Sequence, residues 1–361
     1  MPNNLKDKLI IRPSAGVKIS KYSKDDHIDV FFFYNEGSRR LKIRFLNKYI
    51  SHLEDIIKHG IIRGYNNADS KYPKEIQLLI DELINRNIIV DNKRELWINI
   101  NKYNRFDRQM RLLSEKLPLD KSPHEAQNNI FDTKILIVGI GGMGSNILQQ
   151  LVMMGFRNFH IIDPDTIELS NLNRQTIYSI SDIGKLKIDV ASEWAASYYD
   201  KMQISKSALT LEKAINKKCL NSYEPDLIIN CADSPSIQNT TREIITNMNK
   251  AIPVLVGGGY FLFKVFVGPL IMPGFSACLD CNNYSNLEEN THLTGVGGNI
   301  SSCAAIGAGI SSLNVFKLFS SASECDLLNN QYIIDLNGVS LSKKKLIIDT
   351  NCKTCGKFKR G

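Results

Sequence analysis

A run of glycines between an apolar stretch and a helical stretch constrains the fold of this chain more than any other feature. Residues 135–139 form an apolar run that ends in a glycine, which is typical of a strand buried on both faces of a sheet. Apolar residues at helical spacing follow over 143–155. The glycines of the run are Gly139, Gly141, Gly142 and Gly144. Such a turn brings backbone N–H groups and a helix N-terminus to one point, so we expect a site for nucleotide phosphates.

The chain beyond residue 134 alternates between short apolar runs and helical stretches. We expect further strands at 159–163, 227–231 and 254–257 and helices at 185–200 and 235–250. Because this alternation buries a parallel sheet between helices, the predicted fold class is α/β, with a Rossmann-like doubly wound domain. The most apolar stretch, 253–273, is interrupted by glycines and Lys264. It indicates two buried strands around a glycine turn, and we expect no membrane span.

The first hundred residues follow a different pattern, with short runs of β-branched and aromatic residues before two amphipathic stretches. We expect strands at 17–22, 29–34 and 40–45, a turn at 35–38, and helices at 47–59 and 72–87. Three small strands followed by helices predict a small winged-helix-like α+β domain over residues 1–95. A second domain then spans 96–361, and its first part, to about residue 121, is expected to be a connector carrying a helix.

Composition excludes some classes of function. The net charge of +8 over 361 residues is spread along the chain, whereas nucleic-acid binding usually shows a concentrated basic face. We therefore expect anionic small ligands and no nucleic acid. The first six residues lack the apolar core of a signal peptide, and eight cysteines without such a signal favour reduced thiols and metal binding. These observations predict a cytoplasmic protein.

Charged residues near the glycine run separate two kinds of nucleotide enzyme. Asp163 ends the second apolar strand, where a carboxylate can accept hydrogen bonds from ribose hydroxyls. The simpler alternative is a glycine turn with a helix-capping aspartate. Arg174 and Lys187 lie in the segments 171–175 and 182–187 that follow. A triphosphate needs several cations and a nicotinamide cofactor needs few, so the pattern favours ATP over a dehydrogenase.

Two C-x-x-C pairs predict a metal site. The four cysteines are Cys278, Cys281, Cys352 and Cys355. Each pair presents two thiolates about one turn apart, and four thiolates fill a tetrahedral zinc site, which makes the metal structural. A strand expected at 345–349 would bring the second pair back to the first, and a redox pair is the alternative. Cys303 opens an apolar helix after the loop 283–302, and the absence of cysteine from that loop makes a thioester step doubtful.

Taken together, these motifs resemble those of the E1-like (ThiF/MoeB-type) adenylating enzymes, which activate ubiquitin-like proteins and small peptides. The resemblance covers roughly 105–361. It rests on Arg105–Gln109, Gly139–Gly144, Asp163, Asn171–Gln175, Gly184–Lys187 and the tripeptide Cys231-Ala232-Asp233. It implies the same fold, ATP and Mg²⁺ as cofactors, and a structural Zn²⁺ held by the four cysteines. The loop 283–302, which contains Gly295, Gly297 and Gly298, is expected to be a mobile cover over the substrate carboxylate.

The resemblance further implies a role for each matching residue. The residues expected to bind the nucleotide are the four glycines, Asp163 at the ribose, Asp165, Gln175, and Asn173, Arg174 and Lys187 at the phosphates. Asp233 is expected to bind Mg²⁺, and Arg108 to reach the γ-phosphate of ATP in the partner subunit of a homodimer. As alternatives, Arg108 and Arg174 are surface charges, Asp233 caps a helix, and Lys185 replaces Lys187.

The layout of the whole chain is similar to that of the microcin C-type peptide-adenylating enzymes of ribosomal peptide biosynthesis. The resemblance implies that the first domain binds the leader of a precursor peptide, with 40–45 and 72–87 as the expected groove. A carboxylate of the peptide would then be adenylated and pyrophosphate released. The alternatives are activation of a ubiquitin-like sulfur carrier, a noncatalytic protein that presents a peptide, and a first domain that only stabilises a dimer.

Overall fold

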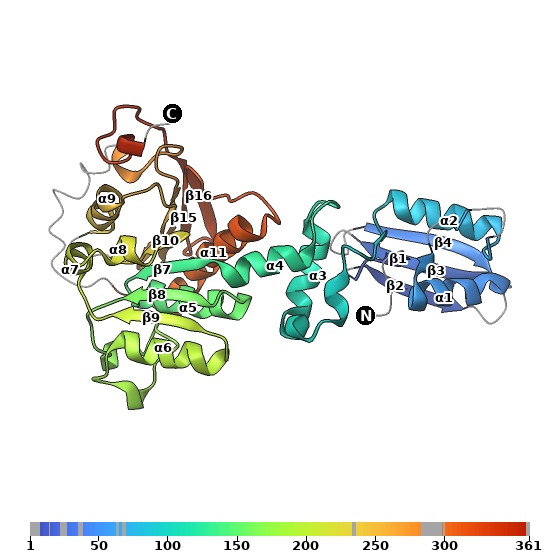
Figure 1. Ribbon diagram of the computed structural model, residues 1–361, viewed down its shortest axis with the longest axis horizontal. Helices are drawn as coiled ribbons and strands as arrows, with labels where there is room; N and C mark the ends of the chain where they lie inside the picture. Colours follow the sequence, from blue (N-terminus) through green and yellow to red (C-terminus); the bar gives the residue numbers. More distant parts are fainter. Residues whose placement is uncertain are drawn as a thin grey trace. The chain divides into compact units, whose positions relative to one another are not determined.

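The structure is a computed structural model that describes residues 8–13, 15–21, 27–34, 39–62, 65–66, 70–232, 236–282, 298 and 300–358. The chain divides into two compact units, 1–128 with 320–323 and 129–319 with 324–361 (Figure 1). The first unit therefore continues past residue 95 and includes the connector. The expected end of the peptide-binding domain at residue 95 stays a prediction.

The first unit contains two three-stranded antiparallel sheets and two main helices. Its strands are β1 (Lys8–Ile11), β2 (Gly16–Lys21), β3 (His27–Tyr34), β4 (Arg39–Leu46), β5 (Ile61–Ile62) and β6 (Ile89–Asp91), and its helices are α1 (Ile50–His59) and α2 (Lys74–Asn85). One sheet has the order β2-β3-β4 and the other β5-β1-β6. The three predicted strands and both predicted helices are confirmed, whereas the second sheet was not predicted. The predicted turn at 35–38 lies outside the described residues.

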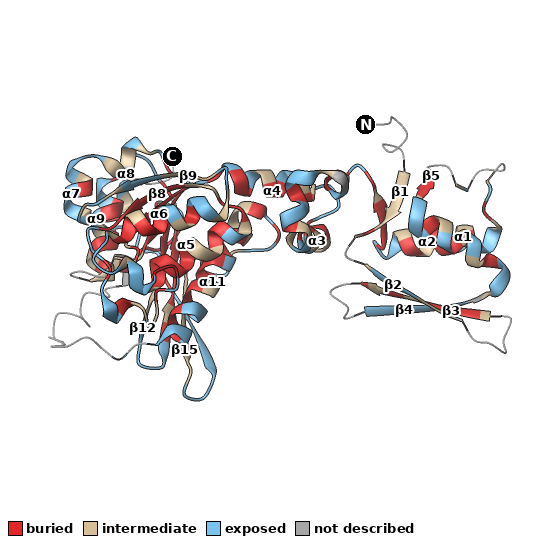
Figure 2. Ribbon diagram, turned by 90° about the horizontal axis from the view of Figure 1, so that it is seen from below, coloured by how far each residue is buried: buried red, intermediate tan, exposed pale blue. Residues whose placement is uncertain are grey.

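The core of the first unit lies between the sheet β2-β3-β4 and the two helices. Alternate residues of β3, among them Val30 and Phe32, are fully buried, and α2 contributes Ile76 and Ile80. Figure 2 shows α1 and α2 covering one face of this sheet, while the other face is turned away from them. The period of two in β3 therefore sorts its side chains between the core and the outer face.

A buried polar cluster connects the end of β6 to the connector helix α3 (Asp107–Lys116). The Arg94 guanidinium donates to the carbonyl oxygens of Ser114 and Leu117 at 2.8 and 3.0 Å. Glu95 accepts from the Trp97 indole at 2.7 Å and from the Ser114 hydroxyl at 2.9 Å. Burial lowers the pKa of Arg94, and Glu95 beside it opposes that change. These bonds fix the chain direction where the small domain leads into the connector, which ends in α4 (Pro123–Asp132).

The second unit is built on a six-stranded sheet with the order β14-β11-β10-β7-β8-β9. Its strands are β7 (Lys134–Val138), β8 (Asn158–Ile162), β9 (Gln203–Ser207), β10 (Leu227–Asn230), β11 (Val254–Val256) and β14 (Leu270–Ile271). All pairs are parallel except β11 with β14. In chain order this is the 3-2-1-4-5-6 arrangement of a doubly wound nucleotide-binding fold. The predicted fold class is confirmed.

Within the described residues, the α-helices of this unit are α5 (Gly142–Met154), α6 (Lys187–Tyr198), α7 (Leu211–Asn216), α8 (Cys219–Ser222), α9 (Ile237–Asn247) and α11 (Ser301–Ser320). By length and composition, α11 is apolar enough to span a membrane, but half of its apolar window is buried inside the structure. Ser311 donates to the carbonyl oxygen of Gly257 at 3.2 Å, and Ser312 to Gln150 at 2.7 Å. These contacts and this burial are those of a core helix.

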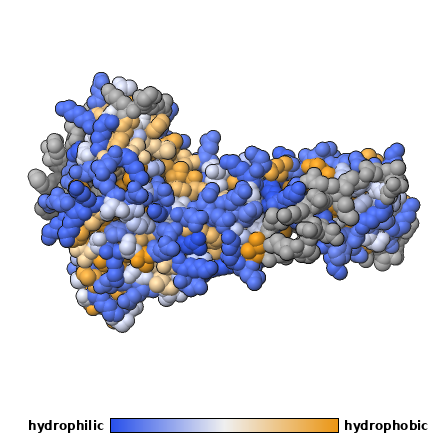
Figure 3. Space-filling view, viewed as in Figure 1, coloured by the Kyte–Doolittle hydropathy of each residue, from blue (hydrophilic) through white to orange (hydrophobic). Residues whose placement is uncertain are grey.

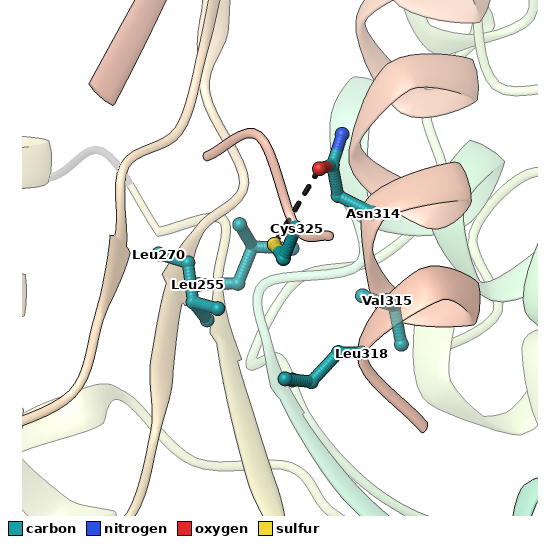
Figure 4. Close-up of a pocket in the computed structure, with 6 residues that line it drawn as sticks. All are labelled: Leu255, Leu270, Asn314, Val315, Leu318 and Cys325. Atoms are coloured by element: carbon teal, nitrogen blue, oxygen red, sulfur yellow. Dashed lines mark hydrogen bonds between the residues drawn. The ribbon is translucent and has the colours of Figure 1, made fainter. Parts of the chain in front are cut away.

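Apolar side chains fill the space between α11 and the neighbouring strands β11 and β14 (Figure 4). The residues that line this gap are Leu255, Leu270, Asn314, Val315, Leu318 and Cys325. The Cys325 thiol donates to the Asn314 amide oxygen at 3.4 Å, and burial raises its pKa. Cys325 is partly buried, and burial therefore favours its protonated thiol, which is the less reactive form.

A second, antiparallel sheet corrects two predictions. Its order is β12-β13-β15-β16, with strands Gly259–Phe261, Lys264–Val267, Asn330–Asp335 and Ser340–Lys345. The stretch 253–273 thus contains four short strands, β11 to β14, and not two. The strand predicted at 345–349 is wrong, because β16 ends at Lys345. Every residue of β16 is exposed. Its sequence therefore lacks the alternation of apolar and polar residues on which a strand prediction depends.

Candidate nucleotide site and cysteine cluster

The glycine run lies at the point where the strand order reverses. The chain leaves β7 into Gly139, moves first to β8 and β9 on one side, and later returns to β10 on the other. Cys231 follows β10, and its backbone N–H donates to Val138 at the end of β7. In open α/β sheets, ligands bind in the crevice at this switch point. The predicted glycine loop therefore lies where a doubly wound fold binds a nucleotide.

Two of the glycines are required by the protein's own backbone. Gly139 has a φ of +88°, and a Cβ there would lie 2.9 Å from the carbonyl carbon of Cys231. A Cβ on Gly144 would lie 1.9 Å from the carbonyl oxygen of Gly139. Both positions allow β7, β10 and α5 to approach closely. A Cβ on Gly141, in contrast, would meet no described atom within 4 Å, so this side of the loop is open to a ligand.

Asp163 connects the glycine loop to the end of β8. One carboxylate oxygen accepts from the Ile140 N–H at 2.6 Å, and the other accepts from the Asp165 N–H at 2.9 Å. Burial raises the pKa of Asp163, while the positive charge of Lys187 and these two bonds oppose the rise. Each oxygen keeps a second lone pair. Asp163 thus holds the loop in place and can still accept from a ribose hydroxyl.

Lys187 is a buried cation with an exposed partner. Its ammonium lies 2.8 Å from the Asp165 carboxylate, and the exposed fractions of the two side chains are 9% and 61%. The Tyr178 hydroxyl donates to the Ile140 carbonyl oxygen at 3.0 Å and lies 3.4 Å from the Lys187 carbonyl oxygen. Burial raises the pKa of this phenol. Lys185 instead points to the surface and pairs with Asp182 at 2.8 Å. Of the two lysines, Lys187 is the one at the glycine loop.

Asn146, which was not predicted, joins the segment 171–175 to the loop. Its amide donates to the carbonyl oxygens of Gly142 and Arg174, at 2.7 and 2.9 Å. The Arg174 guanidinium donates to Asn173 at 2.9 Å. Gln175 is buried, and its side-chain oxygen has no hydrogen-bond partner among the described residues. The structure therefore brings Asn173, Arg174 and Gln175 to the same loop as Lys187.

Two predicted residues are not among those that the structure describes within this unit. Arg108 is exposed on α3 in the first unit. Asp233 lies outside the described residues, as do Gly295 and Gly297 of the predicted cover. Cys303 is fully buried at the start of α11, where its thiol donates to the carbonyl oxygen of Leu262 at 3.4 Å. A buried thiol is unreactive, so this burial argues against Cys303 as a nucleophile.

The four predicted cysteines form one cluster. Their sulfur atoms all lie within 4.8 Å of one another, and three of the separations are 3.5 Å (Cys281 to Cys355), 3.6 Å (Cys278 to Cys352) and 3.8 Å (Cys278 to Cys281). Zinc–sulfur bonds of about 2.3 Å in a tetrahedron place sulfur atoms about 3.8 Å apart. The cluster therefore fits a four-coordinate zinc ion.

Asp280, between the first two cysteines, ties the cluster to α9. Its carboxylate accepts from two nitrogens of Arg242, each at 2.7 Å, from Gln238 at 2.9 Å and from the Thr354 hydroxyl at 2.6 Å. Burial raises the pKa of Asp280, but the bonds from Arg242 and Thr354 outweigh it and the net shift is downward. Because Thr354 lies in the second pair, a single carboxylate sets the spacing of both pairs.

Comparison with curated proteins shows similarity to E1 enzyme subunits. The chain is 33% identical over 172 residues to the NEDD8-activating enzyme E1 catalytic subunit of Caenorhabditis elegans. The matched stretch covers 42% of this chain and 36% of that protein. A protein of the same description from Schizosaccharomyces pombe is 33% identical over 170 residues, covering 46% and 37%. The chain thus spans about a third of the length of these relatives.

Solved structures match over a longer stretch. Escherichia coli MccB, crystallised with AMPCPP and MccA, superimposes with a TM-score of 0.73 at 21% identity, covering 97% of this chain and 99% of that chain. The structure of PaaA has a TM-score of 0.64 at 22% identity, covering 76% and 92%. These likenesses establish the fold. The model of the ThiF family matches residues 113–355, more than half of the sequence, and the chain therefore belongs to the ThiF family.

Proposed function

We propose that this protein is an ATP-dependent enzyme that adenylates a carboxylate of a ribosomally made precursor peptide. The observation that carries the proposal is the position of Lys187, a buried ammonium beside the open side of the glycine loop. A buried cation is expensive unless it has a partner or an anionic ligand. Its present partner, Asp165, is mostly exposed and leaves room for a phosphate.

In the proposed reaction, an oxygen of the substrate carboxylate attacks the α-phosphorus of ATP. The bond between the α-phosphorus and the bridging oxygen breaks, and its electron pair leaves with pyrophosphate. The product is an acyl adenylate. This displacement depends on positioning and charge neutralisation, which Arg174, Lys187 and the N-terminus of α5 would supply. Asp163 and Asp165 would hold the ribose, Asp233 would bind Mg²⁺, and the four cysteines would hold a structural zinc ion.

The first unit supports a peptide as the substrate. MccB, whose solved structures include complexes with MccA, matches nearly the full length of this chain. Within the described residues, β4 forms an edge of the sheet β2-β3-β4. Its inward residues Leu41 and Ile43 pack on the core, and α2 exposes Leu78. An extended peptide could therefore add a strand beside β4 and place apolar side chains against α2.

The outer face of β4 suggests the charge of that peptide. Arg40, Lys42 and Arg44 alternate on it, and all three are exposed. The carboxylate near them is Asp29, opposite Arg44 on β3, which lies 2.8 Å from Lys42 and 3.6 Å from Arg44. Because Lys42 and Arg44 share this carboxylate and Arg40 lies over the Phe31 ring, an added strand with acidic residues at every second position would complement the face.

We also propose a homodimer in the cytoplasm, with Arg108 acting on ATP in the partner subunit. Support comes from exposed apolar residues of the second unit, which Figure 3 shows in separate groups on one face. The hairpin between β12 and β13 exposes Phe261, Leu262 and Phe263, and the next hairpin exposes Val339 and Leu341. Side chains of this kind are typically covered in an oligomer.

Pyrophosphate release with candidate substrates tests the proposal. We expect ATP-dependent release with a short peptide encoded beside the gene, and none with that peptide lacking the reactive carboxylate. Release with a ubiquitin-like carrier, and not with peptides, would favour the second candidate, which the identity to NEDD8-activating subunits supports. Peptide binding without release from any substrate would show a noncatalytic peptide-presenting protein.

A further inference from the structure

The hydroxyl of Tyr260 lies in the glycine loop. A Cβ on Gly142 would lie 1.8 Å from this oxygen and 3.1 Å from the ring carbon Cζ that carries it. Contacts as short as 1.8 Å do not occur between such atoms, so Gly142 is a glycine because the tyrosine occupies that space. Gly139 and Gly144 make room for backbone, and Gly141 alone faces open space among the described atoms.

The backbone holds Tyr260 firmly in this position. It is the central residue of β12, paired with Val265 on β13. Gly258 precedes the strand with a φ of +90°, and a Cβ there would lie 2.0 Å from the carbonyl oxygen of Phe266. The chain can therefore bend into β12 only with glycine at 258, and the bend aims the phenol of Tyr260 at the loop. Its ring is half-buried.

The surroundings of the hydroxyl are those of an anion site. The Nε atom of Arg174 lies 3.5 Å from the same point beside Gly142. Gly142 is also the first residue of α5, whose free N–H groups carry partial positive charge. A phenol adds a neutral donor that hydrogen-bonds to phosphate oxygens without adding charge.

We infer that Tyr260 is a further residue of the nucleotide site, and that its hydroxyl donates a hydrogen bond to a phosphate oxygen of bound ATP. The inference rests on the proposed function, because it assumes that the loop binds a triphosphate. It adds a residue from the antiparallel sheet to a site otherwise built from the doubly wound sheet. That connection would also tie the position of the hairpin after β12 to nucleotide binding.

Tyr260→Phe tests the hydrogen bond. The variant loses a hydrogen bond to a charged phosphate oxygen. Its kcat/KM for ATP, measured by pyrophosphate exchange, should therefore fall by about 10- to 100-fold. Calorimetry should show weaker ATP binding, while far-UV circular dichroism should show the fold of the wild type. Tyr332→Phe, which removes a hydroxyl from β15 of the same sheet, is the matched control and should behave as wild type. An unchanged or higher kcat/KM for Tyr260→Phe would overturn the inference.

A second test needs no nucleotide and therefore separates this inference from the proposed function. Gly142→Ala should lower the melting temperature by about 4 °C or more, because its methyl group collides with the hydroxyl. The double variant with Tyr260→Phe should recover part of that loss. Gly141→Ala, whose methyl group meets open space, is the control for stability. No recovery in the double variant would show that the hydroxyl does not occupy the loop. If wild type failed to bind ATP while recovery occurred, the proposed function would fail and the placement of Tyr260 would stand.

Discussion

Lys187 and Asp165 form an ion pair in which the ammonium is buried and the carboxylate is exposed. The residue-scale chemistry of the site depends on this asymmetry, because a phosphate can replace or share the exposed partner. The sequence predicted Arg174, Lys187 and Asp163 from their residue types and order. It could not predict Asn146, Tyr260 or Asp280, because their roles arise from contacts between segments distant in the chain.

The two lysines in 184–187 give a matched pair of variants. Lys187→Met should lower the rate of ATP–pyrophosphate exchange by about 10²- to 10³-fold, because one preorganised cation is lost at the phosphates. Lys185→Met, which removes only an exposed pair with Asp182, should keep nearly the full rate. Equal losses in both variants would show that net charge, and not position, explains the effect.

Asp233 is the expected magnesium ligand. Asp233→Asn should abolish adenylation while the far-UV spectrum and melting temperature stay those of wild type, because the amide removes the negative charge that a hard cation needs. Exchange assays over a range of Mg²⁺ concentrations would check this. Normal pyrophosphate release by the variant would remove the proposed role in metal binding.

At the scale of elements, strand and helix periods predicted the small domain and the parallel sheet well. Two of the strands that escaped prediction share a reason. The strand β9 is mostly polar and β16 is fully exposed, so neither shows a buried face in its sequence. The cysteine cluster was predicted because its spacing is local within each pair. The predicted strand that would return the second cysteine pair to the first was wrong, because 346–349 forms no strand.

Asp280 predicts how strongly the cluster holds zinc. Asp280→Asn should weaken zinc binding by about 10- to 100-fold, because the amide weakens the bonds that space the two cysteine pairs. Competition with a chromophoric chelator measures this affinity. Asp335→Asn, which changes a half-buried carboxylate on β15 outside the cysteine cluster, is the control and should bind zinc as wild type does. Cys352→Ser should lose the metal and much of its solubility; an unchanged zinc content in that variant would refute the site.

The edge strand β4 predicts a charge-dependent peptide interaction. Arg40→Glu combined with Arg44→Glu should weaken binding of the precursor peptide at least tenfold and reduce the dependence of binding on salt. Fluorescence anisotropy with the labelled peptide measures both effects. Lys58→Glu, on the exposed side of α1, is the control and should leave binding unchanged. Equal binding by the charge-reversed variant and wild type would move the peptide site away from β4.

For the molecule as a whole, the chain joins a doubly wound nucleotide-binding unit of the ThiF family to a small α+β unit. The sequence predicted the ThiF-type unit, because glycine, cysteine and charged motifs stand in a fixed order along it. The small α+β unit carries no sharp sequence motif, so the assignment of a peptide substrate depends on the layout of the chain and on the outer face of β4. The activity, the dimer and the substrate are proposals. They depend on one another, because Arg108 would act on ATP bound to the partner subunit.

Calorimetric titration of the zinc-loaded protein with ATP and Mg²⁺ tests the central claim most directly. The glycine loop, Lys187 and Arg174 should bind ATP with an affinity that falls at least tenfold in Lys187→Met and stays unchanged in Lys185→Met. Absence of heat from ATP binding in the intact wild-type protein would contradict the account, because the site would then gather no triphosphate for any carboxylate to attack.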